Sequence, residues 1–284
     1  MTDCIETVGS SLIQHGPVND RVYLMKLARQ DCPDIVGQLE RLATDQGYSK
    51  IFAKVPSTVL ELFLENGYEL EATIPGFYQS ADACFLGKYY CHNRRLEPEP
   101  EQVRTIMKVA RHQQPVREQQ HLPGGFFCRI AEKSDVDMMA EVYRSVFESY
   151  PFPIFDPDYL LEIMGTTVFL GVWKGTELVA LSSAEIDRKS RTVEMTDFAT
   201  LPDYRGHGLA LYLLQKMEQE MALRGIQSFY TIARAYSHGM NITFARNGYC
   251  YAGILTNNTN SPSMLKSMNV WYKQAMSVQS HAVV

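Results

Sequence analysis

The sequence predicts a layered α/β fold of the α+β kind, in which helices flank a central mixed sheet. Three observations predict it. Strand-like and helix-like segments alternate irregularly along the second half of the 284-residue chain. A glycine-rich turn at residues 205–208 joins a strand to a helix. A weaker copy of the same order of elements occupies about the first ninety residues.

The elements of the second half are assigned from hydrophobic periodicity and from turn residues. The pattern predicts strands at 126–131, 167–173, 177–187, 191–200, 228–233, 249–255 and 268–272. It predicts helices at 135–149, at 160–164, from the glycine turn to about 223, and at 240–247. Ser134, followed three residues later by Asp137, predicts a capping box for the first of these helices.

The segment 92–125 is rich in Glu, Gln, Pro and Arg and predicts a connector. Its middle, at 100–112, has apolar residues at helical spacing, so we expect one amphipathic helix there. The chain is accordingly divided into an N-terminal domain at 1–91, a linker with one helix at 92–125, and a second domain at 126–284.

The N-terminal domain carries the signs of an internal duplication. FLENGY at 63–68 matches FARNGY at 244–249, and both lie in the order helix, strand, helix, strand, strand. The first copy has LARQDCPDIVGQL where the second has LPDYRGHGLALYLL, so it lacks the paired glycines. Open strand edges invite aggregation, and we expect this degenerate half-domain to dock onto the second domain or onto a partner subunit.

Composition excludes several classes of function. The chain is 45% hydrophobic and 21% charged, as ordinary globular proteins are. A net charge of −5 and a pI near 5.8 give no basic surface for nucleic acid. No apolar run reaches the roughly 18 residues of a membrane span, and the N-terminal segment lacks a signal core, so we expect a cytoplasmic protein without a membrane partner.

The six cysteines are scattered and form no C-x-x-C pair. This predicts reduced, structural thiols, with no metal site and no disulfide framework.

The glycine turn is the first candidate site. A helix N-terminus presents unpaired N–H groups and a partial positive charge, so it binds phosphate readily. Gly206 and Gly208 let the backbone approach an anion closely. The stretch 205–210 reads R-x-x-G-x-A, which is neither a nucleotide P-loop nor a dinucleotide fingerprint.

An R-x-x-G-x-A turn between strand and helix, after a Pro-acid-Tyr turn, resembles the acetyl-CoA loop of the GNAT acyltransferase superfamily. The resemblance implies acetyl-CoA as co-substrate, no metal, and direct acetyl transfer to an amine. It implies that the pantetheine arm pairs with the backbone of one strand, at Phe198, Ala199 and Thr200. It also implies that the following turn holds the pyrophosphate, through Arg205, Gly206, His207, Gly208, Leu209 and Ala210.

The attacking amine requires a base. An alkylammonium has a pKa of about 10.4, and its deprotonation at pH 7 costs about 4 to 5 kcal/mol. Glu194 and Asp197 precede the glycine turn on TVEMTDFAT, and side chains alternate along a strand, so we expect them on opposite faces. Glu194 is the expected base, and Asp197 is expected to be a buried structural acid or a group that supports the site from behind. The alternative for both is a carboxylate satisfied at the edge of the sheet.

Many superfamily members carry a tyrosine four residues before the Gly-aromatic pair, where it protonates the departing thiolate. Phe244 occupies that position here. Tyr236, Tyr249, Tyr251 or a water molecule would replace it if an acid is needed. A thiol pKa near 8.5 makes a strong acid dispensable.

Longer stretches resemble the β-lysine N6-acetyltransferase family, among them YPFPIFDPDYL, VEMTDFATLPDYRGHGLALYLL and YTIARAYSHGMNITFARNGYCYAG. The resemblance implies a small-molecule amine acceptor, β-lysine, and a product that accumulates against osmotic stress. A diamino acid needs acidic partners for its second ammonium, for which Glu185, Asp156 and Asp197 are candidates. Its carboxylate needs donors, for which the candidates are Arg234 and the amide cluster of Asn257, Asn258 and Asn260.

Other functions remain open from the sequence. The same chemistry would serve a polyamine, ordinary lysine or a protein lysine. Phe244 and the degenerate N-terminal copy also suit a non-catalytic acyl-CoA-binding sensor. Self-association as a homodimer is a further expectation, of unspecified symmetry.

Overall fold

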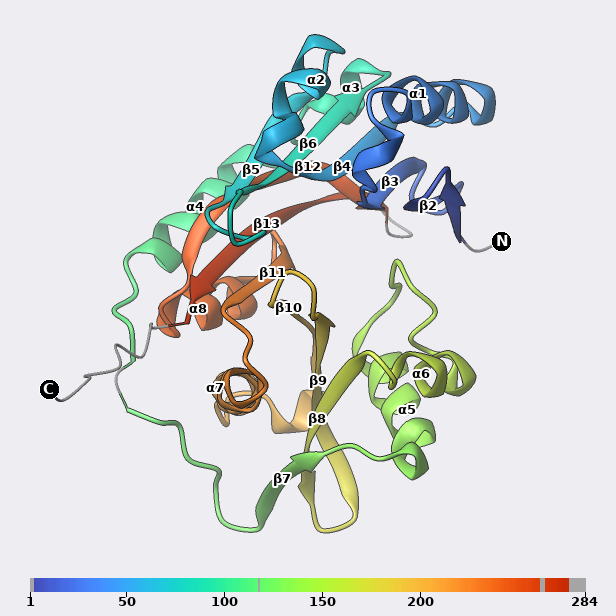
Figure 1. Ribbon diagram of the computed structural model, residues 1–284. Helices are drawn as coiled ribbons and strands as arrows, with labels where there is room; N and C mark the ends of the chain where they lie inside the picture. The colour runs from blue at the N-terminus through green and yellow to red at the C-terminus, as the bar shows by residue number, and fades with distance from the viewer. Residues whose placement is uncertain (1–2, 117, 261–263, 276–284) are drawn as a thin grey trace, which may run out of the picture.

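The computed structural model describes residues 3–116, 118–260 and 264–275. One mixed sheet of 13 strands runs through these residues, with helices on its faces (Figure 1). The strand order is β1-β2-β3-β4-β6-β5-β12-β13-β11-β10-β9-β8-β7. The layered α/β fold is therefore confirmed.

The strands are β1 Cys4–Val8, β2 Ser11–Gly16, β3 Arg21–Lys26, β4 Lys50–Pro56, β5 Glu69–Ile74, β6 Ala83–Tyr89, β7 Phe126–Ile130, β8 Thr167–Lys174, β9 Glu177–Asp187, β10 Thr192–Thr200, β11 Ser228–Arg234, β12 Cys250–Asn260 and β13 Leu265–Gln274. The α-helices are α1 Ile35–Gln46, α2 Leu60–Glu65, α3 His92–Arg95, α4 Pro100–Arg111, α5 Val136–Val146, α6 Pro157–Ile163, α7 Leu209–Leu223 and α8 His238–Arg246. The 3₁₀ turns are η1 Arg29–Asp31, η2 Ser57–Val59, η3 Lys133–Asp135 and η4 Pro202–Tyr204.

Each element expected in the second half and in the linker is present, and most differences lie at the ends. The linker was expected to contain one helix, and it also contains the short helix α3 at His92–Arg95. Helix α5 stops at Val146, because Phe147 adopts extended backbone angles. Helix α6 begins at Pro157, where the Asp156 side chain accepts a hydrogen bond from the N–H of Asp158. Strands β12 and β13 are several residues longer than the pattern predicted.

The capping box before α5 is displaced from its predicted position. Glu132 and Asp135 form it, not Ser134 and Asp137, because a 3₁₀ turn precedes the α-helix. Asp135 is buried and accepts two hydrogen bonds from the guanidinium of Arg129, at 2.6 and 2.8 Å. These bonds lower the pKa of the Asp135 carboxyl and fix the start of α5.

Replacing Asp135 by Asn is expected to lower the free energy of unfolding by about 1 to 2 kcal/mol at pH 7. A carboxyl with a lowered folded pKa stabilises the fold above its unfolded pKa, and this contribution disappears as pH falls through the folded pKa. The difference between the variants should therefore shrink below about pH 4. Urea unfolding at several pH values measures it. The exposed neighbour Asp137, replaced by Asn, serves as the control and should change stability by less than about 0.5 kcal/mol.

The sheet order shows the duplication directly. The strands β1-β2-β3-β4-β6-β5 and β8-β9-β10-β11-β13-β12 occupy equivalent places on the two sides of the β5 and β12 pair. In both halves the third and fourth strands of this order pair in parallel, β3 with β4 and β10 with β11. The repeat thus extends three strands upstream of the elements in which the sequence revealed it.

The repeated FLENGY and FARNGY motifs form the same corner. The rings of Phe63 and Tyr68 meet edge to face with centroids 5.0 Å apart, and those of Phe244 and Tyr249 do so at 5.1 Å. In each motif the glycine has a positive φ, +78° and +80°. The sequence match therefore reflects a match of packing and backbone.

The two halves join edge to edge through β5 and β12. Gly253 pairs with Ala72, and a Cβ atom on Gly253 would lie only 2.1 Å from the carbonyl oxygen of Glu71. Only glycine permits this approach. The N-terminal half-domain therefore docks onto the second half of its own chain, which is the first of the two arrangements expected.

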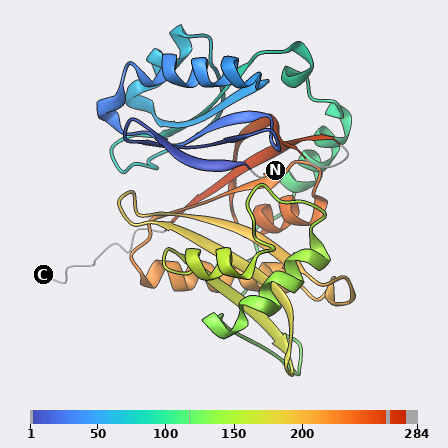
Figure 2. The same cartoon turned by 90° about the vertical axis from the view of Figure 1, so that its right-hand side faces the viewer.

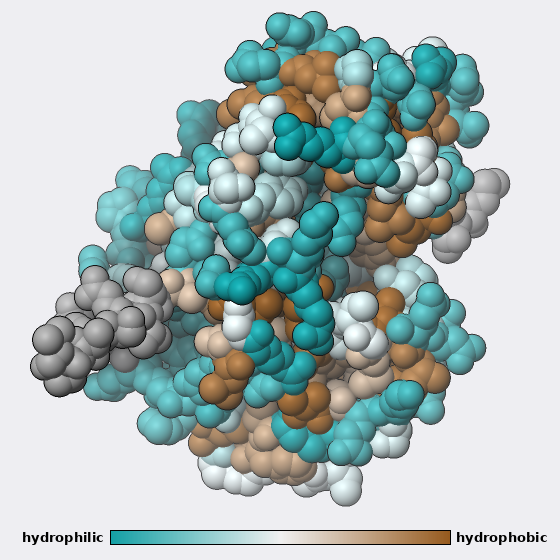
Figure 3. Space-filling view, viewed as in Figure 1, coloured by the Kyte–Doolittle hydropathy of each residue, from teal (hydrophilic) through white to brown (hydrophobic). Residues whose placement is uncertain are grey.

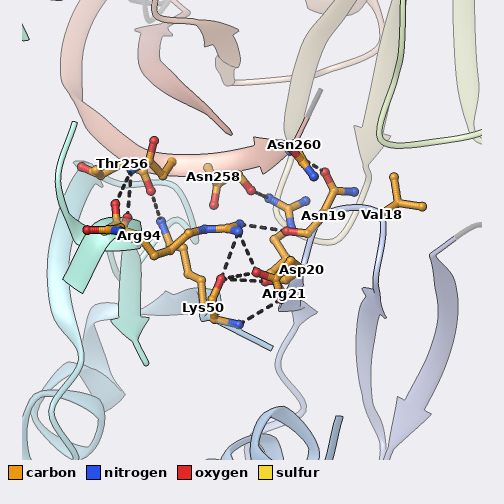
Figure 4. A network of polar contacts seen from close by, with 12 residues as sticks. Val18, Asn19, Asp20, Arg21, Lys50, Arg94, Thr256, Asn258 and Asn260 are labelled. Carbon is orange, nitrogen blue, oxygen red and sulfur yellow. Dashed lines mark hydrogen bonds and ion pairs between the residues drawn. The ribbon is translucent and has the colours of Figure 1, made fainter. Parts of the chain in front are cut away.

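Buried polar groups hold this junction together (Figure 4). The Lys50 ammonium donates to the carboxylate of Glu71 at 3.0 Å and to the carbonyl oxygen of Thr256 at 2.7 Å. The N–H of Asn260 donates to the side-chain oxygen of Asn19 at 3.1 Å. The bonds from Lys50 to Thr256 and from Asn260 to Asn19 cross between the halves, so the relative placement of the two is specific.

Helices cover the sheet of the second half on both faces, α7 on one and α5 with α6 on the other (Figures 1 and 2). In the N-terminal half α1 covers the outer face, and the inner face presents Tyr23, Phe52 and Phe85, which pack with Tyr230 of β11. The linker helix α4 packs in the same core cluster as α8. The inner face of the N-terminal half thus packs against β11 and its neighbour β13.

No helix among the described residues is long and apolar enough to cross a membrane. On the face seen in Figure 3, apolar residues form separate patches among hydrophilic ones.

Candidate active site

A bulge in β10 sets the geometry of the site. The register between β10 and β9 shifts between Thr196 and Ala199, and Asp197 has a φ of +54°. Met195 packs in the core under α7, but Ala199, four residues later, packs in the core under α5. In a regular strand these two would share a face, so the bulge inserts one extra residue.

The bulge corrects one sequence expectation. Glu194 and Asp197 do not lie on opposite faces, because the inserted residue returns Asp197 to the α5 side, where Glu194 also points. Glu185 on β9 is the register partner of Glu194 and shares that face. Three carboxylates therefore gather on one side of the sheet.

Beside the bulge, β10 and β11 separate. They pair only over 192–194 and 228–230. Beyond these residues a cavity of about 820 Å³ lies between the two strands, α7 and α8. Phe198 and Thr200 line it from the edge of β10 that has left β11, so this backbone can receive an extended partner as an added strand would.

The cavity reaches the glycine turn. Gly206 and Gly208 have φ values of +83° and +73°, and α7 begins at Leu209 with no side-chain cap. In the described part of the chain, no protein group accepts a hydrogen bond from the backbone N–H groups of residues 206–211. A row of free N–H groups at a helix N-terminus fits an anionic diphosphate without a metal.

Of the residues expected to bind the cofactor, seven line the cavity: Phe198, Thr200, Arg205, Gly206, Gly208, Leu209 and Ala210. Ala199 is buried in the core on the α5 side. The His207 ring turns back to the turn itself, with Nδ1 3.1 Å from the carbonyl oxygen of Tyr204. Backbone groups of these last two residues, not their side chains, would face a ligand.

Asp197 lines the cavity and is held in place by hydroxyl groups. Tyr150 donates to one carboxylate oxygen, and the Ser183 hydroxyl donates to the other at 2.5 Å. Burial raises the pKa of Asp197, and the hydrogen bonds from Ser183 and Tyr150 offset part of that rise. Tyr150 lines the cavity as well.

Unlike Asp197, Glu194 and Glu185 do not line the cavity. Burial raises the pKa of Glu194, and the hydrogen bond from the Tyr230 hydroxyl partly opposes it. Desolvation by the surrounding protein, followed by the charges of Glu194 and Asp197, raises the pKa of Glu185, although this residue stays exposed to solvent. Like charges on one face of the sheet, together with desolvation, disfavour the ionised forms of these carboxyl groups.

The residues expected to bind the acceptor are separated by the fold. Arg234 lines the cavity and donates to the carbonyl oxygen of Ser149 at 2.8 Å. Asp156 caps α6 and lies outside the cavity. Asn258 is buried at the junction of the halves, where its carbonyl oxygen accepts from Arg21, whereas Asn260 reaches the cavity.

The apolar ring of Phe244 lines the cavity at the place of the missing tyrosine. Among the three tyrosines considered as substitutes, only Tyr236 lines the cavity, and its hydroxyl donates to Glu97 of the linker. Tyr249 is buried in the core, and Tyr251 packs on Trp271.

Tyr150 and Gln120 are among the cavity residues that the sequence analysis did not find. Tyr150 reaches Asp197 from 47 positions away, and Gln120 of the linker contacts the place where a Cβ on Gly208 would lie. Neither belongs to a motif. The only signal near Tyr150 was the stretch YPFPIFDPDYL, which carries part of the family resemblance but does not single out that residue.

A splayed strand pair, a bulged strand and a glycine turn with free N–H groups together define a site for an acyl-coenzyme A thioester. A comparison with protein families agrees with this class. Residues 136–249 match the family described as "Acetyltransferase (GNAT) family". The ribosomal-protein-S18-alanine N-acetyltransferase structure from Escherichia coli aligns with a TM-score of 0.49 and 14% identity, covering 56% of this chain and 99% of that one.

Three curated relatives match nearly end to end. The β-lysine N(6)-acetyltransferase of Methanococcus maripaludis is 39% identical over 94% of this chain and 97% of its own. N-acetyltransferase YodP of Bacillus subtilis is 32% identical over 93% and 96%. The β-lysine N(6)-acetyltransferase of Methanosarcina mazei is 30% identical over 84% and 96%. The chain therefore belongs to the GNAT family of N-acetyltransferases, and acetyl-CoA is its co-substrate.

Proposed function

We propose that this chain transfers the acetyl group of acetyl-CoA to the terminal amine of β-lysine. Two relatives that it matches over most of their length carry the name of that activity. The observation that carries the proposal is the cluster of Glu185, Glu194 and Asp197 on one face, beside the cavity that ends at the glycine turn. Acidic groups in this position suit an acceptor with two ammonium groups.

Glu194 is the proposed general base. Burial raises the pKa of Glu194, and a general base works best when its pKa lies close to the working pH. It does not line the cavity, so the proton of the acceptor ammonium would reach it through a water molecule. Asp197, fixed by Tyr150 and Ser183, would orient that ammonium at the cavity wall.

Arg234 is the proposed partner of the acceptor carboxylate. Its guanidinium lines the cavity, and one of its nitrogens is already fixed on Ser149, which leaves further N–H groups for a carboxylate. The carboxylate of the substrate would thus bind at Arg234, and its ammonium groups would face the acidic cluster. This arrangement favours an amino acid over a polyamine.

The departing thiolate needs little help, because its conjugate acid has a pKa of only about 8.5. Tyr236, or a water molecule in the cavity, would supply the proton that a tyrosine at position 244 supplies in other members.

The residues named in this proposal lie in 126–284, which we propose as the catalytic domain, with 1–91 as the half-domain and 92–125 as the linker. We also propose that the product, a near-neutral zwitterion, accumulates as a compatible solute.

Release of thiol from acetyl-CoA with four acceptors tests the proposal: β-lysine, α-lysine, spermidine and a lysine peptide. We expect kcat/KM for β-lysine to exceed the others by at least about tenfold, because misplacing one charged group costs on the order of 1.4 kcal/mol or more. Equal rates for the two lysines would refute the assignment to β-lysine. Tight binding of coenzyme A with no release for any amine would favour a sensor.

A further inference from the structure

The N-terminal half-domain lacks the glycine turn, yet its inner face approaches the acidic cluster. We propose that Lys54 on β4, acting through the hydroxyl of Tyr230 on β11, keeps Glu194 ionised and oriented, so that the half-domain completes the catalytic site. Lys54 is then a positioning residue that does not touch the substrate. This inference rests on the proposed role of Glu194 as the base.

The contact between Lys54 and Tyr230 is direct. The Nζ atom of Lys54 lies 3.1 Å from the Tyr230 hydroxyl. The same ammonium lies 5.4 Å from the centroid of the Tyr230 ring and 5.7 Å from that of Phe77. The two residues are 176 positions apart in the sequence, so the contact exists only because the halves share one sheet.

Tyr230 continues the contact to Glu194. The two are register partners in the short parallel pairing of β11 with β10, so their side chains lie next to each other on one face of the sheet. An ammonium can only donate hydrogen bonds, so the Tyr230 oxygen accepts from Lys54. The phenolic proton is therefore free to donate to the Glu194 carboxylate. The result is a directed chain from cation to phenol to carboxylate.

The charges around Glu194 make such a chain necessary. The other acidic groups near it are Glu185 on β9 and Asp197 on β10, and Tyr23 faces it from β3. Burial, followed by the charges of Glu185 and Asp197, raises the pKa of Tyr159 on α6. Burial raises the pKa of Glu194, and Lys54 is the first of the influences that oppose it. Without Lys54 and Tyr230, a carboxylate in this cluster would take up a proton and lose its function as a base.

The test compares pH profiles of kcat/KM for Lys54→Met, Lys54→Arg and Tyr230→Phe with that of the wild type. Removing a cation that lowers the pKa of Glu194 must raise that pKa, so the acidic limb should move to higher pH. We expect a shift of about one pH unit for Lys54→Met, and less for Lys54→Arg, which keeps the charge. Tyr230→Phe should move the limb in the same direction. Lys88→Met is the control, because Lys88 lies on β6 of the same half-domain but pairs with Glu40 of α1, which covers the outer face.

A second measurement separates tuning of the base from damage to the fold. In the Glu194→Gln background, Lys54→Met should cause no further loss, since there is no carboxylate left to tune. An unchanged acidic limb in Lys54→Met, or the same fold-loss of activity with and without Glu194, would overturn the inference.

Failure of this inference can be told from failure of the proposed acceptor. If wild type prefers an amine other than β-lysine, the profiles are measured with that amine, and the acceptor alone is wrong. If no amine is acetylated, carbon NMR titration of labelled glutamate side chains in wild type and Lys54→Met reads the Glu194 carboxyl directly. Identical titration in the two proteins would then refute the role of Lys54.

Discussion

Glu194→Gln is expected to lower kcat/KM for the acceptor amine at pH 7 by about 10²- to 10³-fold, because a positioned base contributes that much. The amide has nearly the same shape and can still accept from Tyr230, so the fold and the binding of acetyl-CoA should be kept. The loss should shrink as pH approaches the pKa of the free amine, about 10.4, where no base is needed. Thiol release measured from pH 6 to pH 10 checks this.

Glu141→Gln provides a matched control for Glu194→Gln. Glu141 is an exposed carboxylate on α5 that pairs with Arg144 on the same helix. Its replacement should leave the profile unchanged. A Glu194→Gln rate within about threefold of the wild type at pH 7 would show that another group takes the proton. Asp197, which lines the cavity, would then be the base to test.

The sequence predicted the second half of the fold well, because its signals are local. Periodic apolar residues located β8 to β10 and α7, and the glycine turn located the start of that helix. The duplication was visible because FLENGY and FARNGY encode the same corner. Strands β1 to β3, which extend the repeat, carry no shared motif, so their equivalence to β8 to β10 emerged only from the order of the sheet.

The face of Asp197 could not be predicted from alternation. Alternation holds only for regular strands, and the bulge at Asp197 requires a positive φ in a residue other than glycine. Aspartate tolerates that conformation better than most residues, so an aspartate in the middle of a strand was the one signal available. The consequence is large, because the bulge places Asp197 on the same face as Glu194 and Glu185, and the site then contains three carboxylates.

Contacts between residues far apart in the sequence could not be predicted from the sequence either. Tyr150 meets Asp197, and Lys54 meets Tyr230, through the folding of one sheet and not through any spacing in the chain. The sequence suggested that the half-domain had lost its phosphate site, and nothing in it indicated that a lysine of that half-domain reaches the acidic cluster. Site residues that belong to a turn are therefore readable from sequence, whereas those supplied by a neighbouring layer are not.

Gly206→Ala is expected to raise KM for acetyl-CoA by about 10- to 100-fold, because it disturbs the turn that presents the free N–H groups. Gly206 has a φ of +83°, and no atom lies within 4 Å of the place where its Cβ would be. An alanine there would fit in space but be strained in the left-handed conformation by about 1 kcal/mol. The turn can relieve this strain by rotating its amides away from the cavity. Titration of binding with coenzyme A, and KM for acetyl-CoA, measure the effect.

The other end of the same helix offers a matched control. Gly225 follows α7 with a φ of +79°, and its Cβ position is equally open. Gly225→Ala should therefore lower the melting temperature about as much as Gly206→Ala does, since the backbone strain is the same in kind. It should leave KM for acetyl-CoA unchanged, because residue 225 does not line the cavity. Equal KM values in the two variants would show that the N–H groups of 206–211 do not hold the diphosphate, and the pyrophosphate would then have to bind through side chains such as Arg205.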